Sequence, residues 1–204
     1  PGVDSLALCA ACQLQLPRPS CACPHCAMAM PVAEVCGQCQ QKPPPFDRAI
    51  AAYHYGYPLD WLVQRMKFSH RRDIGRTLAL LMQRSLSDRL GVVDAIVPVP
   101  LHAIRQRQRK FNQAELLAKP LRAIAKAPLM PLLRRSANTP AQSTLPKAER
   151  GKNVRNAFEV VANVPKRLAI VDDVMTSGAT VAECTKQLKK AGAQWVEVWT
   201  LARA

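Results

Sequence analysis

Two adjacent carboxylates stand in the stretch "LAIVDDVMTSGAT", residues 168–180, directly after four apolar residues and shortly before Thr, Ser, Gly and Thr. Neighbouring acids repel each other, so a purely structural role would favour separating them. The pair, Asp172 and Asp173, therefore indicates a partner that supplies positive charge or hydroxyl donors.

The apolar run before the acids predicts a buried strand, and the residues after them predict a turn that opens a helix. In open parallel sheets, ligands bind outside the carboxyl ends of the strands, which is where these acids are expected. The turn offers hydroxyls and backbone N–H groups to a phosphate, and Gly178 lets the backbone approach an anion closely. Both features together suit a phosphorylated ribose. The competing interpretation is that Asp172 or Asp173 caps the helix and that the turn is structural.

Seven of the eight cysteines lie within the first 39 residues, where three C-x-x-C pairs follow one another. Such a pair places two thiolates on one side of a tight turn, and two pairs complete the tetrahedral ligand set that zinc prefers. We expect one zinc ion on Cys23, Cys26, Cys36 and Cys39.

Three further cysteines, Cys9, Cys12 and Cys21, leave two alternatives open. A second zinc ion on these residues would require His25 or another donor as its fourth ligand. Alternatively, Cys9 and Cys12 belong to the principal site and another pair is free. The zinc unit either contacts nucleic acid or only staples a segment that is too small to have its own core.

The elements that must position these residues alternate along the chain between strand and helix. Strands are predicted at 49–57, 94–100, 158–161, 168–171 and 195–202, and helices at 59–69, 73–90, 111–127 and 180–193. This alternation predicts an α/β fold with a largely parallel, doubly wound sheet. Pro120 is expected to kink or restart its helix. The triple proline at 43–45 predicts a boundary between a cysteine-rich domain, 1–45, and a larger domain, 46–204.

The composition limits the choice of partners. The chain has 204 residues, 49% of them hydrophobic, with 29 Lys and Arg against 14 Asp and Glu and a net charge of +15. The hydrophobic content is that of a globular protein, and the excess of positive charge favours an anionic partner such as nucleic acid or a phosphorylated metabolite. No apolar run is long enough to span a bilayer, and the first residues lack the features of a secretory signal. We therefore expect a cytoplasmic location and no membrane insertion.

Residues 168–180 resemble, position for position, the phosphoribosyl pyrophosphate signature of type I phosphoribosyltransferases. Nearly the whole chain resembles the ComF family, which couples an N-terminal zinc ribbon to such a domain. The motifs that carry this likeness are "KPPPFDRAIAAYHYG", "MKFSHRRDIG", "VPVPLH", "FNQAELLA" and "ERGKNVRNAF". The resemblance implies a type I phosphoribosyltransferase-like parallel sheet flanked by helices and preceded by a small zinc-ribbon domain. It also implies a link to the uptake of single-stranded DNA in natural competence.

By matching position, the resemblance implies that Asp172 and Asp173 are the catalytic residues and contact the ribose hydroxyls, directly or through Mg²⁺. The 5′-phosphate would lie in the turn made by Thr176, Ser177, Gly178, Ala179 and Thr180. Pyrophosphate, the leaving group, would be held by cations that follow the strand at 94–100, for which the candidates are Arg105, Arg107, Arg109 and Lys110.

Lys110 departs from the family pattern, because ComF-like sequences usually carry glycine just before the "FNQ" element. If glycine serves there to permit a positive φ, Lys110 would distort the loop or add a phosphate contact. A second uncertain region is the polar, basic stretch 136–155, which matches the position of a hood loop that closes over substrate in these enzymes. Arg150, Lys152 and Asn153 are the candidate ligand residues in it, and an ordinary surface loop is the alternative.

Two functions of different classes follow. The first is a Mg²⁺-dependent phosphoribosyltransferase that transfers phosphoribose to an unknown acceptor. The second is a non-catalytic competence protein that uses the same cleft, or its basic surface, to bind a phosphorylated ligand, single-stranded DNA or the DNA-uptake machinery. The aromatic content of 5% offers few residues for base stacking. A purely structural zinc adaptor would leave the acid pair unexplained, and neither the acceptor nor the oligomeric state follows from the sequence.

Overall fold

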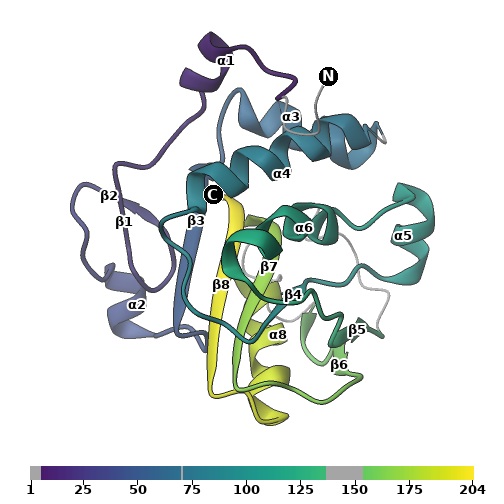
Figure 1. The fold of residues 1–204 in the computed structure, drawn as a ribbon. Coiled ribbons are helices and arrows are strands. Elements are labelled where there is room, and N and C mark those ends of the chain that lie inside the picture. The colour runs from purple at the N-terminus through teal and green to yellow at the C-terminus, as the bar shows by residue number, and fades with distance from the viewer. Residues whose placement is uncertain (1–5, 70, 137–153) are drawn as a thin grey trace.

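A four-stranded parallel sheet forms the centre of the computed structural model, which describes residues 6–69, 71–136 and 154–204. The strand order is β3-β8-β7-β4, and every neighbouring pair runs parallel (Figure 1). The strands are β3 (Arg48–His54), β8 (Trp195–Arg203), β7 (Arg167–Met175) and β4 (Ala95–Pro98). The predicted α/β fold, with a parallel sheet flanked by helices, is confirmed.

Helices cover both faces of this sheet. One face packs against α3 (Leu59–Phe68), α4 (Arg72–Leu86) and α6 (Gln113–Ala125), and the other against α8 (Ala179–Lys190) (Figure 1). Successive strand residues point to opposite faces, so Leu168 and Ile170 join the apolar cluster on the α8 side while Ala169 and Val171 join the cluster on the other side. The uninterrupted apolar run "LAIV" is thus the pattern of a strand that is buried on both faces.

Strand β7 is longer than predicted. It continues past Val171 through both acids to Met175, because β8 pairs with it up to the register Met175↔Arg203. The acids therefore lie within the last part of the strand and not after it. Helix α6 continues through Pro120 as one element, so of the two predicted effects of this proline the restart does not occur.

Two elements near the carboxyl end of β4 differ from the sequence prediction. The segment "FEV" forms β6 (Phe158–Val160), which pairs antiparallel with β5 (Leu133–Arg135) in a separate two-stranded sheet and does not join the parallel sheet. The basic segment after β4 was expected to be a loop and is instead the short helix α5 (Ala103–Arg109). None of its residues is buried, so it has no apolar periodicity from which a helix could be predicted.

The N-terminal segment is a small unit that packs on the sheet. It contains α1 (Ala10–Leu14), the antiparallel pair β1 (Cys21–Ala22) and β2 (Ala29–Met30), and α2 (Gly37–Gln41). Ala27 belongs to the apolar cluster on the α8 side, and the main-chain N–H of His54 in β3 donates to the carbonyl of Pro17 at 2.7 Å. Among the described residues, no helix combines the length and the apolar character needed to cross a bilayer.

Candidate ligand-binding cleft and cysteine cluster

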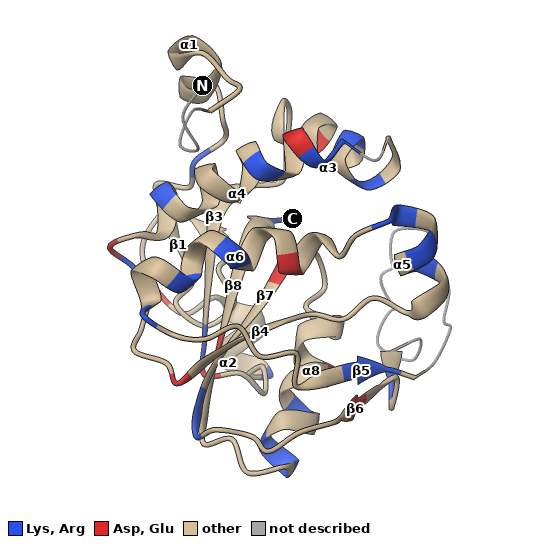
Figure 2. Ribbon diagram, turned by 45° about the vertical axis from the view of Figure 1, so that its right-hand side comes forward, with Lys and Arg blue, Asp and Glu red and all other residues tan. Residues whose placement is uncertain are grey.

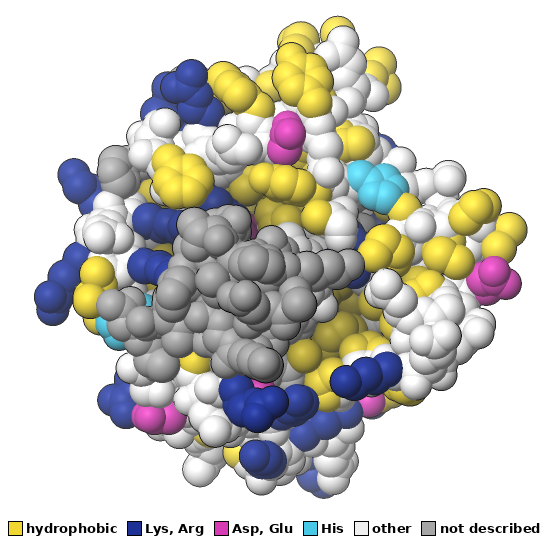
Figure 3. Space-filling model, turned by 180° about the vertical axis from the view of Figure 1, so that it is seen from behind, with side chains coloured by type: hydrophobic (Ala, Val, Ile, Leu, Met, Phe, Trp, Pro, Cys, Tyr) yellow, Lys and Arg dark blue, Asp and Glu magenta, His cyan; other side chains and the backbone are white. Residues whose placement is uncertain are grey.

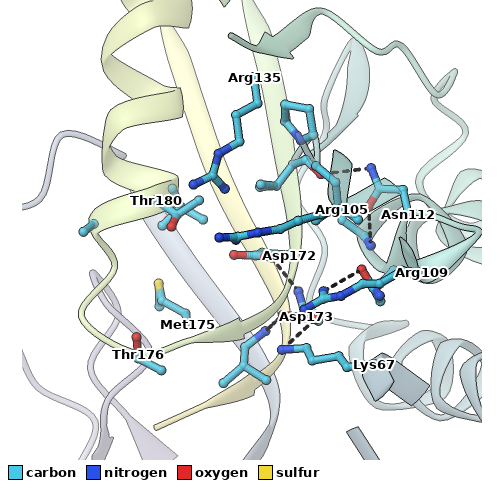
Figure 4. Close-up of a pocket in the computed structure, with 18 of the residues that line it drawn as sticks. Lys67, Arg105, Arg109, Asn112, Arg135, Asp172, Asp173, Met175, Thr176 and Thr180 are labelled. Atoms are coloured by element: carbon cyan, nitrogen blue, oxygen red, sulfur yellow. Dashed lines mark hydrogen bonds and ion pairs between the residues drawn. The ribbon is translucent and has the colours of Figure 1, made fainter. Parts of the chain in front are cut away.

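A cavity of about 420 Å³ opens at the carboxyl ends of β7 and β4 (Figure 4). Parallel strands bring their carboxyl ends to one edge of the sheet, and the segments that follow them form the walls of a cleft there. The lining comes from the end of α3, the segment after β4, α5, the start of α6, β5, the end of β7 and the start of α8.

The two acids have different surroundings because adjacent residues of a strand point to opposite faces. The side chain of Asp173 lies on the α3 and α6 side, where its Oδ2 is 2.9 Å from the Nζ of Lys67 and its Oδ1 accepts the N–H of Val174 at 2.7 Å. Asp172 lies on the α8 side, where its Oδ1 accepts the N–H of Asp173 at 2.8 Å and Arg135 is nearby. The two carboxylates therefore have different hydrogen-bond and ion-pair partners.

Burial, together with the negative charge of Asp173, raises the pKa of Asp172 to about 7. The hydrogen bond from the N–H of Asp173 and the charges of Lys67 and Arg135 oppose this rise. Asp173 already has an ion-pair partner in Lys67. Asp172, which lines the cavity, therefore changes protonation near neutral pH.

The turn after β7 has the geometry of an anion site. Gly178 adopts φ 73°, a left-handed conformation that disfavours a side chain, and it precedes the first residue of α8. Residues 176–180 all line the cavity, so the amino end of this twelve-residue helix faces the cleft. The N–H groups at such an end attract a phosphate.

Three arginines line the wall opposite the turn. Arg105 and Arg109 come from α5, and Arg135 comes from β5. Figure 4 shows the guanidinium groups of Arg105 and Arg135 directed toward Asp172 and Thr180. Burial lowers the pKa of all three, and charge repulsion adds to this, from Arg109 on Arg105 and from Arg105 on Arg135. A cluster of desolvated cations of this kind gains most from a bound polyanion.

Arg109 is held in place by neighbours. Its Nη1 donates to the Oε1 of Gln113 at 3.2 Å, and its guanidinium lies 5.7 Å from the centre of the Phe68 ring. Its charge also faces Asp173. Asn112 caps α6 by accepting the N–H of Ala114 at 3.0 Å and donates to the carbonyl of Val99 at 3.0 Å, so α6 is fixed to the end of β4. Lys and Arg residues lie along α3, α5 and β5 around this side of the molecule (Figure 2).

The structure brings most of the candidate ligand residues together and leaves others apart. Those that line the cavity are Asp172, Asp173, Thr176, Ser177, Gly178, Ala179, Thr180, Arg105 and Arg109. Arg107 and Lys110 lie exposed on α5 and at its end, outside the lining. The candidates of the hood, Arg150, Lys152 and Asn153, lie outside the described residues.

Lys110 adopts φ 64° at the C-terminal end of α5. This is the left-handed conformation for which glycine is usually chosen, so the sequence-based explanation of the family's glycine at this position agrees with the backbone found here. The cost is local strain, and Lys110 is not among the residues that line the cavity.

The cavity residues that sequence reasoning missed include Lys67, Asn112, Gln113 and Arg135. Arg135 had a detectable signal, because in "LLRRS" the alternation of a strand places Leu133 and Arg135 on one face, and both are buried. Arg134, between them, is exposed and pairs with Glu159 at 2.7 Å. Lys67 had no such signal, since it lies on an amphipathic helix like any solvated lysine.

Four thiols form a compact cluster in the N-terminal segment. The Sγ atoms of Cys23, Cys26, Cys36 and Cys39 all lie within 4.8 Å of one another. The main-chain N–H of Cys36 also points to the Sγ of Cys23 at 3.4 Å, as in knuckles that bind zinc. Four sulfur donors at this separation fit one tetrahedral metal ion such as zinc, the ligand set predicted from the sequence.

The other three cysteines are not part of this cluster. Cys9 and Cys12 are exposed at α1, and Cys21 is half-buried in β1. Within the described residues, no second group of three or more potential ligands includes them or His25. The structure therefore does not bring Cys9 and Cys12 into the principal cluster.

Comparison with known proteins places the chain among bacterial relatives along nearly its full length. Competence protein F of Haemophilus influenzae is 37% identical over 97% of this chain and 90% of its own length. The DNA utilization protein YhgH of Escherichia coli K12 is 36% identical over 96% of this chain and 90% of its own length. The competence protein ComFC of Streptococcus pneumoniae is 32% identical over 52% of this chain and 47% of its own length. No family model matches the chain.

Among solved structures, an allosteric regulatory enzyme of purine biosynthesis has a TM-score of 0.40 and 21% identity, covering 62% of this chain and 25% of its own. A purine phosphoribosyltransferase of Pyrococcus horikoshii has a TM-score of 0.36 and 16% identity, covering 64% of this chain and 73% of its own. Both TM-scores are too low to bear on function.

Proposed function

Because the chain belongs to the ComF family, we propose that its cleft binds phosphoribosyl pyrophosphate together with Mg²⁺ and that the protein serves the handling of DNA in natural competence. The names of its relatives, competence protein F and DNA utilization protein, support the second part. The first part rests on the chemistry of the cleft.

One observation carries the ligand assignment: Asp172, the turn at 176–180 and the arginine pair Arg105 and Arg135 all face one cavity. The turn and the amino end of α8 suit the 5′-phosphate, and the acid end of β7 suits the ribose hydroxyls. The guanidinium groups suit the pyrophosphate, since arginine forms paired hydrogen bonds to phosphate oxygens. Phosphoribosyl pyrophosphate carries these three groups on one small molecule.

Transfer of phosphoribose would break the bond between ribose C1 and the pyrophosphate oxygen, with the electron pair leaving on pyrophosphate, while an acceptor atom bonds to C1. Arg105 and Arg135 would stabilise the charge that develops on the leaving group. The walls of the cleft would exclude water, which competes with the acceptor for C1. The acceptor follows from none of the described residues.

Asp172 is better placed than Asp173 to bind a magnesium ion. Carboxylate oxygens are the ligands that Mg²⁺ prefers, and both oxygens of Asp173 already have partners in Lys67 and the N–H of Val174. The ion would supply positive charge to the pyrophosphate. In the N-terminal segment, Cys23, Cys26, Cys36 and Cys39 would hold a structural zinc ion.

Calorimetric titration of the zinc-loaded protein with phosphoribosyl pyrophosphate and Mg²⁺ tests the assignment. We expect binding by the wild type and its loss in Asp172→Asn, which removes the charge while keeping the shape. Asp88→Asn, a change at an exposed acid after α4, is the matched control and should bind like the wild type. A folded wild type that binds no ligand would refute the proposal.

A second candidate function, binding of single-stranded DNA, is favoured by exposed aromatic residues on α3 and directly before it. Three of the ten aromatic residues are strongly exposed there: Tyr57 by 81%, Trp61 by 50% and Phe68, which also lines the cleft, by 66%. Arg65 lies over the Trp61 ring at 5.0 Å. Exposed rings beside cations are the feature on which successive bases stack. Figure 3 shows hydrophobic side chains gathered at the end of the molecule that carries α1 and α3.

Fluorescence anisotropy with a labelled oligothymidine tests this second candidate. A Trp61→Ala, Phe68→Ala double variant should lose affinity by roughly 1–3 kcal/mol per stacked base. Val92→Ala removes an exposed apolar side chain from the loop between α4 and β4 and should leave the affinity for the oligonucleotide unchanged. Equal affinity of the double variant and the wild type, or binding that does not weaken with salt, would exclude this surface.

A further inference from the structure

Arg203, the last residue of β8, lies between the cysteine cluster and the cleft. It is only 6% exposed, and its partner in the register of the sheet is Met175, at the end of β7. Neither its position in the chain nor the sequence around it suggested a role.

The Arg203 guanidinium holds two separate segments at once. Its Nε donates to the main-chain carbonyl of Cys26 at 3.0 Å, and its Nη1 donates to the carbonyl of Met175 at 3.0 Å. Nη1 also contacts the carbonyls of Thr176 and Ala204. One planar, permanently charged group therefore bridges a residue of the cysteine cluster and the first residues of the turn at 176–180.

The contact to the turn also orients its N–H groups. In a trans peptide the C=O and the following N–H point in opposite directions, so a carbonyl that is held on one side directs the next N–H to the other side. Arg203 donates to the carbonyls of Met175 and Thr176, and the Met175 carbonyl also accepts the main-chain N–H of Ala204 at 3.1 Å. Carbonyls held in this way direct the N–H groups of Thr176 and Ser177 to the opposite side. Thr176 and Ser177 line the cavity, where such donors meet an anion.

The knuckle that carries Cys26 is also packed against the same region. Ala27, directly after Cys26, is 3% exposed and belongs to the same apolar cluster as Met175. The main-chain N–H of Ala27 donates to the carbonyl of Cys23 at 2.8 Å, so the backbone next to Cys26 is tied to a second cysteine of the cluster. A change in the cluster would move the Cys26 carbonyl relative to Arg203.

We propose that Arg203 is a positioning residue that couples occupation of the cysteine cluster to the shape of the anion-binding turn. With a metal ion on the four thiols, the Cys26 carbonyl is fixed and Arg203 holds the turn in its binding geometry. Without the ion, the knuckle loosens, Arg203 loses one of its two anchors, and the turn becomes less ordered. By linkage, a ligand that orders the turn strengthens metal binding by the same factor.

The first test needs no ligand and no variant. Hydrogen exchange is measured by mass spectrometry on the full-length protein, loaded with zinc, stripped by a chelator, and loaded again. Peptides over 175–180 should exchange about fivefold faster or more in the stripped protein and recover on reloading, as expected for coupling of ordinary size. Peptides over β4 serve as an internal control for global unfolding. The proposal is overturned if the turn exchanges at the same rate in the loaded and the stripped protein while the peptides around Cys26 exchange faster without zinc.

Variants test whether Arg203 is the link. Arg203→Lys keeps the buried charge but replaces the planar guanidinium by a single ammonium group, which cannot bridge two segments. In this variant the amide hydrogens of the turn should exchange fast whether zinc is present or not. Arg167→Met is the matched control, because Arg167 also donates from its Nε to a carbonyl, that of Val92, at the opposite end of β7. It should keep the zinc dependence of the wild type. A zinc-dependent turn in Arg203→Lys would assign the coupling to other contacts and overturn the role of Arg203.

A third experiment tests whether a ligand in the cleft strengthens metal binding. It uses phosphoribosyl pyrophosphate and therefore rests on the proposed function. Phosphoribosyl pyrophosphate with Mg²⁺ should slow the release of zinc to a chromogenic chelator in the wild type and have no effect in Arg203→Lys. If calorimetry shows no binding of this ligand, the proposed function fails, and the exchange experiment still decides the coupling. Binding without any change in zinc release overturns the coupling and leaves the proposed function intact.

Discussion

Asp172 and Asp173 are consecutive residues whose side chains lie on opposite faces of β7, with the N–H of Asp173 donating to Asp172 Oδ1 at 2.8 Å. This arrangement explains how two neighbouring acids are tolerated at the edge of a sheet. Asp173 pairs with Lys67 from α3, and Asp172 remains at the cavity with a raised pKa. The two acids therefore have separate tasks, one in fixing α3 to the strand end and one in meeting a ligand.

The raised pKa of Asp172 predicts how stability depends on pH. In an unfolded chain an aspartate titrates near 4, and in the folded protein burial brings the pKa of Asp172 to about 7. Between these values the folded state binds a proton that the unfolded state lacks, so stability falls as pH rises through this window. Asp172→Asn removes the titration and should be more stable than the wild type by on the order of 2 kcal/mol at pH 8, with a smaller gain at pH 5.

Urea denaturation at the two pH values measures this difference. Asp88→Asn, at an exposed position, should keep the pH dependence of the wild type. An Asp172→Asn variant that is less stable than the wild type at pH 8 would show that the ionised carboxylate is stabilised in the fold.

Two of the three arginines of α5 that were named as candidates for the pyrophosphate site, Arg105 and Arg107, should behave differently. Arg105 lines the cavity and Arg107 does not. Arg105→Ala should weaken binding of phosphoribosyl pyrophosphate by about 1.5–3 kcal/mol, the usual range for a hydrogen bond to a charged group, or roughly ten- to hundredfold. Arg107→Ala should stay within about 0.5 kcal/mol of the wild type. Calorimetric titration of both variants measures the two affinities. Equal losses of affinity would mean that binding responds only to the net charge of the protein.

Much of the sheet and of the acid-and-turn site was predictable because the responsible signals are local. An apolar run, a turn with glycine and an amphipathic helix follow one another within 168–193, and this order determines where the acids lie. The cysteine cluster was predictable for the same reason, since its spacing lies within seventeen residues. The cavity walls were less predictable, because Lys67 and Arg135 come from distant segments whose charges look solvated in the sequence.

The end of β7 and the role of Arg203 show a second limit. Strand β7 extends to Met175 because β8 pairs with it, and nothing in the residues 172–175 themselves indicates that pairing. Arg203 looks like an ordinary basic residue near the end of the sequence, and its buried position follows only from the tertiary contacts with Cys26 and Met175. Long-range pairing of this kind leaves no periodic pattern in a single sequence.

Metal content should distinguish the cluster from the remaining cysteines. Cys36→Ala removes one of four close thiols and should lower bound zinc from about one ion per chain to nearly none, since a structural site needs its full tetrahedral set. The double variant Cys9→Ser, Cys12→Ser changes two exposed thiols outside the cluster and should keep about one ion. Atomic emission spectrometry on purified protein measures both. Loss of zinc in the double variant would place Cys9 and Cys12 among the ligands.

Lys110 gives the last prediction, because its backbone has the conformation of a glycine. At φ 64° a non-glycine residue destabilises the folded state by roughly 1–2 kcal/mol. Glycine relieves this strain, but its greater conformational freedom in the unfolded chain offsets part of the gain in stability. Lys110→Gly should therefore raise the free energy of unfolding by about 0.5 kcal/mol and leave ligand affinity unchanged. Gln106→Gly, inside α5, should instead cost about 1 kcal/mol. If Lys110→Gly weakened the binding of phosphoribosyl pyrophosphate, the lysine would be a phosphate contact, and the strain at its backbone would be the cost of placing that charge.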